Sequence, residues 1–209
     1  MDMGSDNNQS ELQGKTPVNG LSTVVHYKTQ LPQLPVGHTD RSDILMSRLA
    51  DSSSVIMLAP AGYGKTSVIA AALPLLSIDN DIIYYQCDRF DASPGLFISA
   101  CEKQLGLRHI SEETPELEAV VFLLEEIRRI ARPVTIVIDD ICKLNYGTSQ
   151  ELVHILLRYR PDNLKLVFSG RYLPFSSGRL QLNTSICWLS EQDLAFSTDA
   201  FDSLLSTQN

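Results

Sequence analysis

Residues 54–76 of the chain are SVIMLAPAGYGKTSVIAAALPLL, the stretch that decides the fold. It begins with an aliphatic run, continues through a turn that contains two glycines and a Lys-Thr pair, and ends in an apolar segment with helical spacing. Residues 55–59 show no alternation of polar and apolar side chains, which is typical of a strand buried on both faces of a parallel sheet. The stretch predicts a buried strand, a phosphate-binding turn and a helix over residues 65–76.

The turn, APAGYGKT, matches the phosphate-loop pattern G-x-x-x-x-G-K-[ST] at every fixed position except the first, where Ala59 replaces glycine. Gly62 and Gly64 free the backbone, so successive N–H groups can turn toward phosphate oxygens. The positive end of the following helix faces the same anion. Chance is the alternative, but the pattern follows a strand and opens a helix, as a phosphate loop does. We expect the phosphate-binding residues to be Ala61, Gly62, Tyr63, Gly64, Lys65, Thr66 and Ser67.

Two side chains of the turn and two aspartates predict a site for Mg²⁺ and phosphate chemistry. Lys65 can reach the terminal phosphates, where it would act in catalysis as well as in binding, and the Thr66 hydroxyl can ligate Mg²⁺. The strand PVTIVIDD at residues 133–140 ends in two carboxylates. We expect Asp139 to hold Mg²⁺ through water and Asp140 to orient or activate the attacking water. The alternative for Asp140 is that it caps the following turn.

Another buried strand, LVFSGR at residues 166–171, ends in an arginine. From that position Arg171 can reach a γ-phosphate and report its presence, so we expect a catalytic role for it. A surface arginine at the end of a strand is the alternative.

Strands and helices alternate along the rest of the chain, which predicts an α/β fold with a parallel sheet between two layers of helices. Helices are expected over residues 40–52, 93–105, 148–159 and from 114 onward, and two short closing helices begin near residues 190 and 197. Further strands are expected over residues 81–87, 133–140, 164–170 and 185–190.

The first 30 residues are rich in Asn, Gln, Ser and Gly and show no periodicity. Such composition is typical of a flexible segment, so we expect a leader over residues 1–30 and one folded domain over residues 31–209. A chain of 209 residues fits one domain of this kind.

Composition excludes several classes of function. The formal net charge is −8, from 17 basic and 25 acidic side chains, which argues against direct nucleic-acid binding by this chain. No signal peptide and no apolar run of about 18 residues is present, so no membrane association is expected. The four cysteines are scattered and are best explained as reduced thiols. We expect a cytoplasmic protein.

Five segments together resemble a known family: APAGYGKT, YYQCDRFDASPGLFISACEKQL, TIVIDD, LKLVFSGR and WLSEQDLAFSTDAFDSLL. They occur in the order seen in the ATPase domain of MalT-like, large LuxR-family transcription regulators, which belong to the STAND class of P-loop ATPases. The resemblance covers about residues 36–205. Its most specific parts are the A-G-Y-G-K-T loop and the closing L-x-x-x-D-L-A-F-S signature.

The resemblance implies a three-layer α/β/α sandwich with strand order 5-1-4-3-2. It implies that ATP or ADP is bound with Mg²⁺, that ATP sets an active and ADP a resting state, and that slow hydrolysis resets the switch. ATP-dependent self-association is a further expectation. Arg41 is the best match for the arginine that lies near the adenine in this family, and Arg171 matches its arginine sensor. Asp139 and Asp140 match its metal and hydrolysis pair.

The parts that follow this domain in the family, including the sensor repeats and the helix-turn-helix, are absent from the 209 residues. We therefore expect the switch domain of something larger, or its remnant. Two alternatives stay open. A small P-loop kinase would need a lid, for which residues 170–179 are the only segment. A degenerate module would bind nucleotide without turnover.

Overall fold

The computed structural model describes residues 18–110, 113–144, 148–175, 180 and 185–196 of the chain. Its centre is one sheet of five parallel strands in the order β2-β3-β4-β1-β5. Read from the other edge, this is the order 5-1-4-3-2, so the predicted fold and strand order are confirmed. The strands are β1 (Ser54–Leu58), β2 (Asp81–Gln86), β3 (Val134–Asp139), β4 (Leu164–Gly170) and β5 (Ile186–Leu189).

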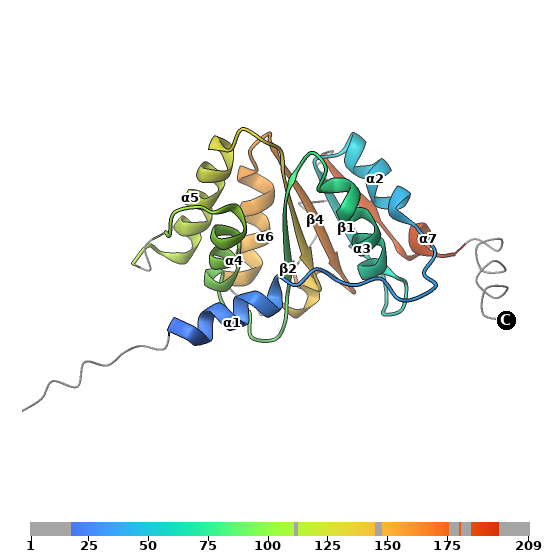
Figure 1. Ribbon diagram of the computed structural model, residues 1–209, viewed down its shortest axis with the longest axis horizontal. Helices are drawn as coiled ribbons and strands as arrows, with labels where there is room; N and C mark the ends of the chain where they lie inside the picture. Colours follow the sequence, from blue (N-terminus) through green and yellow to red (C-terminus); the bar gives the residue numbers. More distant parts are fainter. Residues whose placement is uncertain (1–17, 111–112, 145–147, 176–179, 181–184, 197–209) are drawn as a thin grey trace, which may run out of the picture.

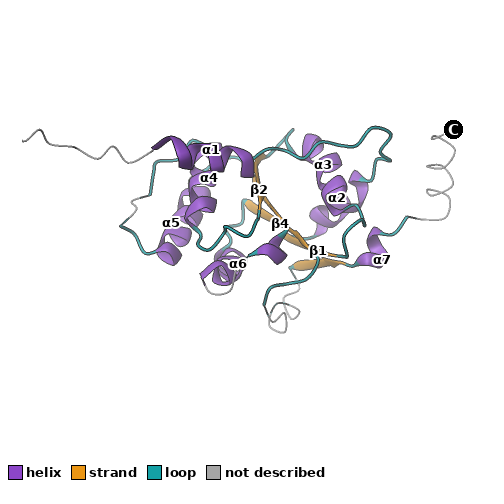
Figure 2. Ribbon diagram, turned by 90° about the horizontal axis from the view of Figure 1, so that it is seen from below, coloured by secondary structure: helices purple, strands orange, loops and turns teal. Residues whose placement is uncertain are grey.

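Helices cover both faces of the sheet, as Figures 1 and 2 show. One layer holds α1 (Val18–Lys28), α4 (Gly95–Leu105), α5 (Glu116–Arg129) and α6 (Thr148–Tyr159). The other holds α2 (Ser42–Asp51), α3 (Lys65–Leu76) and the short α7 (Glu191–Leu194). A 3₁₀ turn, η1 (Ile141–Lys143), follows β3 directly. Among the described residues, no helix combines the length and the apolar character that a membrane crossing requires.

The core has two halves, one on each face of the sheet. Ile56 and Phe168 face the layer of α4, α5 and α6, whereas Val55 and Val167 face α2 and α3. Neighbouring residues of a strand point to opposite faces, so a strand covered on both sides is apolar at most positions rather than at every second one. This explains why the strand sequences show no alternation.

Helix α1 lies within the segment that we expected to be a flexible leader. Residues 18–28 are helical, and α1 contacts α4 and β2 (Figure 1). Val25 is buried in the core, and the Lys28 ammonium, 4% exposed, donates to Asp91 at 2.7 Å. The expectation fails for this part because, among residues 23–28, whose side chains the structure describes, one apolar and one charged side chain are buried, which produces no apolar period. For residues 1–17, which lie outside the described part, the leader stays a prediction.

The short helix α7 begins where the sequence places it. The Asp193 carboxylate accepts hydrogen bonds from the Ser190 N–H and hydroxyl, each at 2.8 Å, in a capping box. The second closing helix, expected from residue 197, lies outside the described residues.

Candidate functional site

The phosphate loop joins the end of β1 to the start of α3. Gly62 and Gly64 have φ angles of 89° and 76°, a left-handed conformation that side chains strongly disfavour. Gly64 is followed at once by α3, and among the described residues no side chain caps this helix start. The first N–H groups of α3 therefore face the loop, where an anion is their natural partner.

Lys65 lies inside the loop rather than on its surface. It is 8% exposed, and its Nζ donates to the carbonyls of Ala59 at 2.7 Å and Pro60 at 2.9 Å. These partners are neutral, and no carboxylate of the described residues pairs with the ammonium. A buried positive charge beside free helix N–H groups fits a phosphate, since the anion would supply the missing counter-charge. Ala59 is itself buried, which explains why a small side chain fits the position of the first glycine.

Asp139 is the most heavily hydrogen-bonded carboxylate of the site. It is 1% exposed and accepts from Thr66 Oγ1 at 2.9 Å, Tyr84 OH at 3.2 Å, the Asp140 N–H at 2.9 Å and Ser169 Oγ. Burial, and secondly the Asp139 charge, raise the pKa of Tyr84, so its hydroxyl stays a donor. Thr66 and Asp139, the two residues predicted to hold Mg²⁺, are thus in direct contact, and their oxygens are of the kind that Mg²⁺ prefers. Tyr84 and Ser169 were missed by sequence reasoning.

Asp140 directly precedes η1 and has a left-handed conformation, with φ at 61° and ψ at 38°. Its carboxylate does not cap the turn; the backbone carbonyl accepts from the Lys143 N–H at 2.9 Å instead. The carboxylate oxygen Oδ2 accepts from Lys143 Nζ at 2.7 Å. This hydrogen bond is the main reason why the pKa of Lys143 is raised. Asp140 therefore lies at the predicted edge of the sheet, but in an ion pair that the sequence analysis did not anticipate.

Arg171 follows β4 at the same edge and is exposed. A Cβ atom at the preceding Gly170 would come within 3.0 Å of Ile141 Cγ1, so the end of β4 packs closely on η1. The Arg171 charge is near enough to oppose the protonation of Lys143. The structure thus brings Arg171 within electrostatic reach of Lys143, and its contact with a γ-phosphate stays a prediction.

Arg41 precedes α2 and lies between the phosphate loop and the chain after β5. Its Nη2 donates to the Leu194 carbonyl at 2.6 Å, and its guanidinium lies 4.3 Å from the centre of the Phe196 ring. Its Nη1 lies 3.7 Å from the position that a Cβ atom of Gly64 would occupy. Burial lowers the pKa of Arg41. Arg41 is therefore beside the phosphate loop, and its expected position near the adenine stays a prediction.

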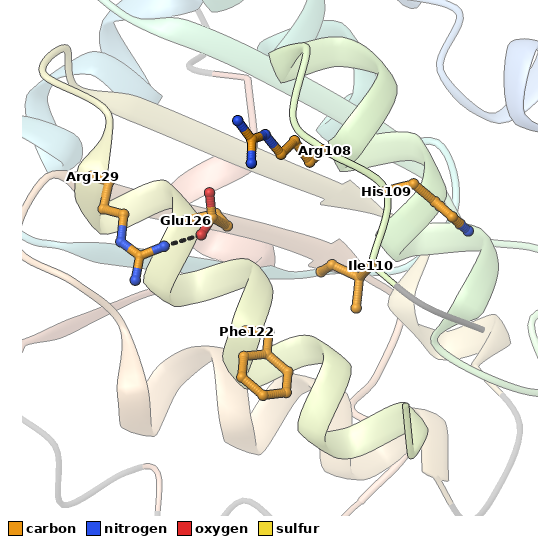
Figure 3. A pocket seen from close by; sticks show the side chains of 6 residues that line it. All are labelled: Arg108, His109, Ile110, Phe122, Glu126 and Arg129. Atoms are coloured by element: carbon orange, nitrogen blue, oxygen red, sulfur yellow. Dashed lines mark hydrogen bonds and ion pairs between the residues drawn. The ribbon is translucent and has the colours of Figure 1, made fainter. Parts of the chain in front are cut away.

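A hollow of about 520 Å³ lies elsewhere, between α5 and the segment after α4 (Figure 3). None of the predicted site residues belongs to it, and the Glu126 carboxylate in it pairs with Arg129. It contains no phosphate loop and no helix start, so the loop edge is the better nucleotide site. The lining residues are Arg108, His109, Ile110, Phe122, Glu126 and Arg129.

Comparisons with known proteins agree with this geometry. The sequence pattern of the AAA domain family matches residues 48–175. The HTH-type transcriptional regulator MalT of Yersinia enterocolitica is 27% identical over 172 residues, which cover 75% of this chain and 18% of MalT. The chain therefore spans less than a fifth of the length of this relative.

Two solved structures share the fold. The ORC1 protein of Aeropyrum pernix, solved in complex with DNA, has a TM-score of 0.60 at 20% identity, over 80% of this chain and 46% of ORC1. A signal transduction ATPase with numerous domains (STAND) and a tetratricopeptide repeat sensor, from Pyrococcus horikoshii, has a TM-score of 0.55 at 19% identity, over 87% of this chain and 26% of its own. The family match spans more than half of the sequence and includes the phosphate loop, and the chain belongs to the AAA domain family, as a nucleotide-binding P-loop ATPase domain of the MalT-like kind.

Proposed function

We propose that this chain is the ATP-dependent switch of a MalT-like, large LuxR-type transcription regulator. ATP and ADP would set its two states, and slow hydrolysis would reset it. The observation that carries the proposal is the meeting of Thr66 and Asp139 beside the Gly62–Gly64 turn. It joins a phosphate cradle to a carboxylate and a hydroxyl that suit Mg²⁺.

The roles of the site residues follow from their positions. The N–H groups of residues 61–67 and the Lys65 ammonium would hold the phosphates. Thr66 and Asp139 would hold Mg²⁺, directly or through water. The metal would supply positive charge that draws electron density from the phosphate oxygens. Asp140 would orient the attacking water or accept a proton from it. Arg171 would contact the γ-phosphate.

Arg41 is proposed to lie beside the base. Its hydrogen bond to Leu194 and its contact with Phe196 link the loop mouth to the chain after β5. A nucleotide bound there would contact both segments, so its release would change the contacts of the chain after β5.

Signal sensing and DNA binding would belong to other segments of the regulator, and ATP would promote self-association of the domain. We propose cytoplasmic action for it.

A second function is favoured by one observation. Asp140 is paired with Lys143, and a domain in which this pair persisted would bind nucleotide without turnover. A small kinase has no comparable support, since its lid would be residues 170–179, of which residues 176–179 lie outside the described part.

Calorimetry of the whole chain with ATP and ADP, with and without Mg²⁺, tests the proposal. Lys65→Ala should abolish micromolar binding, because no other described ammonium enters the loop. Lys103→Ala, at an exposed position of α4, is the matched control and should bind as wild type does. If the folded wild-type chain binds neither nucleotide, the proposed function is wrong. Phosphate transfer to an added acceptor would support the kinase instead.

A further inference from the structure

The Asp140–Lys143 ion pair is built into the turn that follows β3. Asp140 and Lys143 are the first and last residues of a closed turn, which the Lys143 N–H completes by donating to the Asp140 carbonyl at 2.9 Å. Asp140 has a left-handed backbone conformation, and Lys143 Nζ donates to its Oδ2 at 2.7 Å. The side chains are 27% and 38% exposed, so the pair is accessible to solvent but locally fixed.

Other charged groups near Lys143 favour its pairing with Asp140. Its charge helps to lower the pKa of Asp88, which follows β2, so a second carboxylate lies within its electrostatic reach. Asp88 already pairs with Lys28 at 2.9 Å, and the Arg171 charge opposes the protonation of Lys143. Asp140 is thus the carboxylate in direct contact with Lys143, and Asp88 is an alternative acceptor that is partly engaged.

The pairing bears directly on hydrolysis. In that reaction a water oxygen bonds to the γ-phosphorus, the bond from this phosphorus to the β–γ bridging oxygen breaks, and ADP leaves with that oxygen. The water proton passes to the base and then to solvent, so ATP and water give ADP, phosphate and a proton. A carboxylate oxygen that already accepts from an ammonium at 2.7 Å is occupied by that donor and is not free to hold the attacking water. Asp139 is no substitute, because four donors already occupy it.

We propose that Lys143 is a positioning residue that withholds Asp140 from the attacking water, so that turnover requires Lys143 to leave it. The inference rests on the proposed function, in which Asp140 is the base. It assigns the slowness of the switch to one ion pair of this chain. It also gives the switch a point of control, since anything that draws Lys143 toward Asp88 would release Asp140.

Single-turnover hydrolysis of bound ATP by Lys143→Met tests the proposal on the whole chain. The rate constant should rise about two- to fivefold, the range set by breaking a partly exposed ion pair. The affinity for ATP should stay within about twofold of wild type, because Lys143 does not contact the loop. Lys143→Arg restores the charge and should bring the rate back toward wild type. Lys103→Met is the control for removing an exposed lysine.

The double variant Asp140→Asn/Lys143→Met separates a positioning role from a structural one. The gain from Lys143→Met should vanish in the Asp140→Asn background, because no base remains to be released. A gain that persists there, or a rate that falls in Lys143→Met, would overturn the proposal; a fall would mean that Lys143 itself assists the reaction. If ATP binds but Lys143→Met hydrolyses no faster, this inference fails alone. If ATP does not bind wild type, the proposed function fails.

Discussion

The Thr66 hydroxyl donates a 2.9 Å hydrogen bond to the Asp139 carboxylate, although the two residues are 73 positions apart in the sequence. Thr66 lies in the first turn of α3, which follows β1, and Asp139 ends β3; β4 lies between β1 and β3 in the sheet. The contact ties the phosphate loop to the strand that supplies the aspartates. It is the geometry that a shared Mg²⁺ would use.

Thr66→Val should remove most of the gain in ATP affinity that Mg²⁺ provides, because valine keeps the shape of threonine but has no oxygen ligand. Calorimetric titration with ATP, with and without Mg²⁺, measures this gain. Ser77→Ala, just after the other end of α3, removes a hydroxyl that donates to the Pro74 carbonyl and should leave the gain intact. A Thr66→Val variant with the full Mg²⁺ effect would place the metal elsewhere.

Gly64→Ala should destabilise the protein by about 1–2 kcal/mol, because alanine is strained at positive φ. Space is not the cause, since a Cβ atom there would lie an ordinary 3.7 Å from Arg41 Nη1. ATP affinity should fall as well. Urea unfolding gives the stability, and Gly95→Ala, at the start of α4 without a positive φ, is the matched control. Equal stability of the two variants would mean that the loop adopts another conformation.

The phosphate loop was predictable because its signal is local. Gly62, Gly64 and Lys65 act within one turn, and a strand before and a helix after them can be seen in the sequence. The order of the strands was not predictable in this way. Alternation of strands and helices leaves many orders open, and the order 5-1-4-3-2 came from the resemblance to MalT-like regulators.

Tyr84 and Ser169 were missed because they contact Asp139 from neighbouring strands. Tyr84 and Ser169 reach Asp139 because β2 and β4 both pair with β3, and strand order decides such contacts. Ser169 could have been suspected, since it is a polar residue that directly follows the apolar run at residues 166–168 near the end of its strand. The partner of Asp140 could also have been found, because Lys143 is three residues away in a tight turn. Helix α1 has no such signal.

Tyr84→Phe should change stability in a pH-dependent manner. Burial, then Asp139, raise the pKa of Tyr84 above its value in the unfolded chain, about 10. Because the pKa is higher in the folded state, the contribution of Tyr84 to the free energy of unfolding is fully present below about pH 10 and is lost as the pH rises further. Wild type should therefore lose stability between pH 9 and about pH 11 more steeply than Tyr84→Phe does.

Thermal or urea unfolding at the two pH values measures this difference. At pH 7 Tyr84→Phe should cost about 1 kcal/mol, the usual value of a buried hydrogen bond. Tyr159→Phe, in which an exposed ring loses its hydroxyl, should follow wild type at both pH values. If Tyr84→Phe loses as much stability as wild type at high pH, Tyr84 does not ionise on unfolding as described.

Lys28→Met tests whether α1 belongs to the folded domain. The Lys28 ammonium is 4% exposed and lies 2.7 Å from Asp91, which is 2% exposed. Removing one partner of a buried pair leaves the other charge uncompensated. We expect a loss of about 3 kcal/mol, the lower end of the range for such pairs, because Tyr85 and the Asp88 N–H still donate to Asp91.

Lowering the pH should reduce the contribution of the Lys28 ion pairs to the free energy of unfolding. Burial raises the pKa of Asp88, but hydrogen bonds from Lys28 and the Phe90 N–H outweigh it, so the pKa is lowered. A depressed folded pKa gives stability that is present above the unfolded value, about 3.9, and is lost as the pH falls through the folded value. Urea unfolding of Lys28→Met and of the exposed control Lys103→Met at pH 7 measures the main effect. Equal stability of the two would show that α1 does not pack on the sheet, and the domain would then begin after residue 30, as the sequence first indicated.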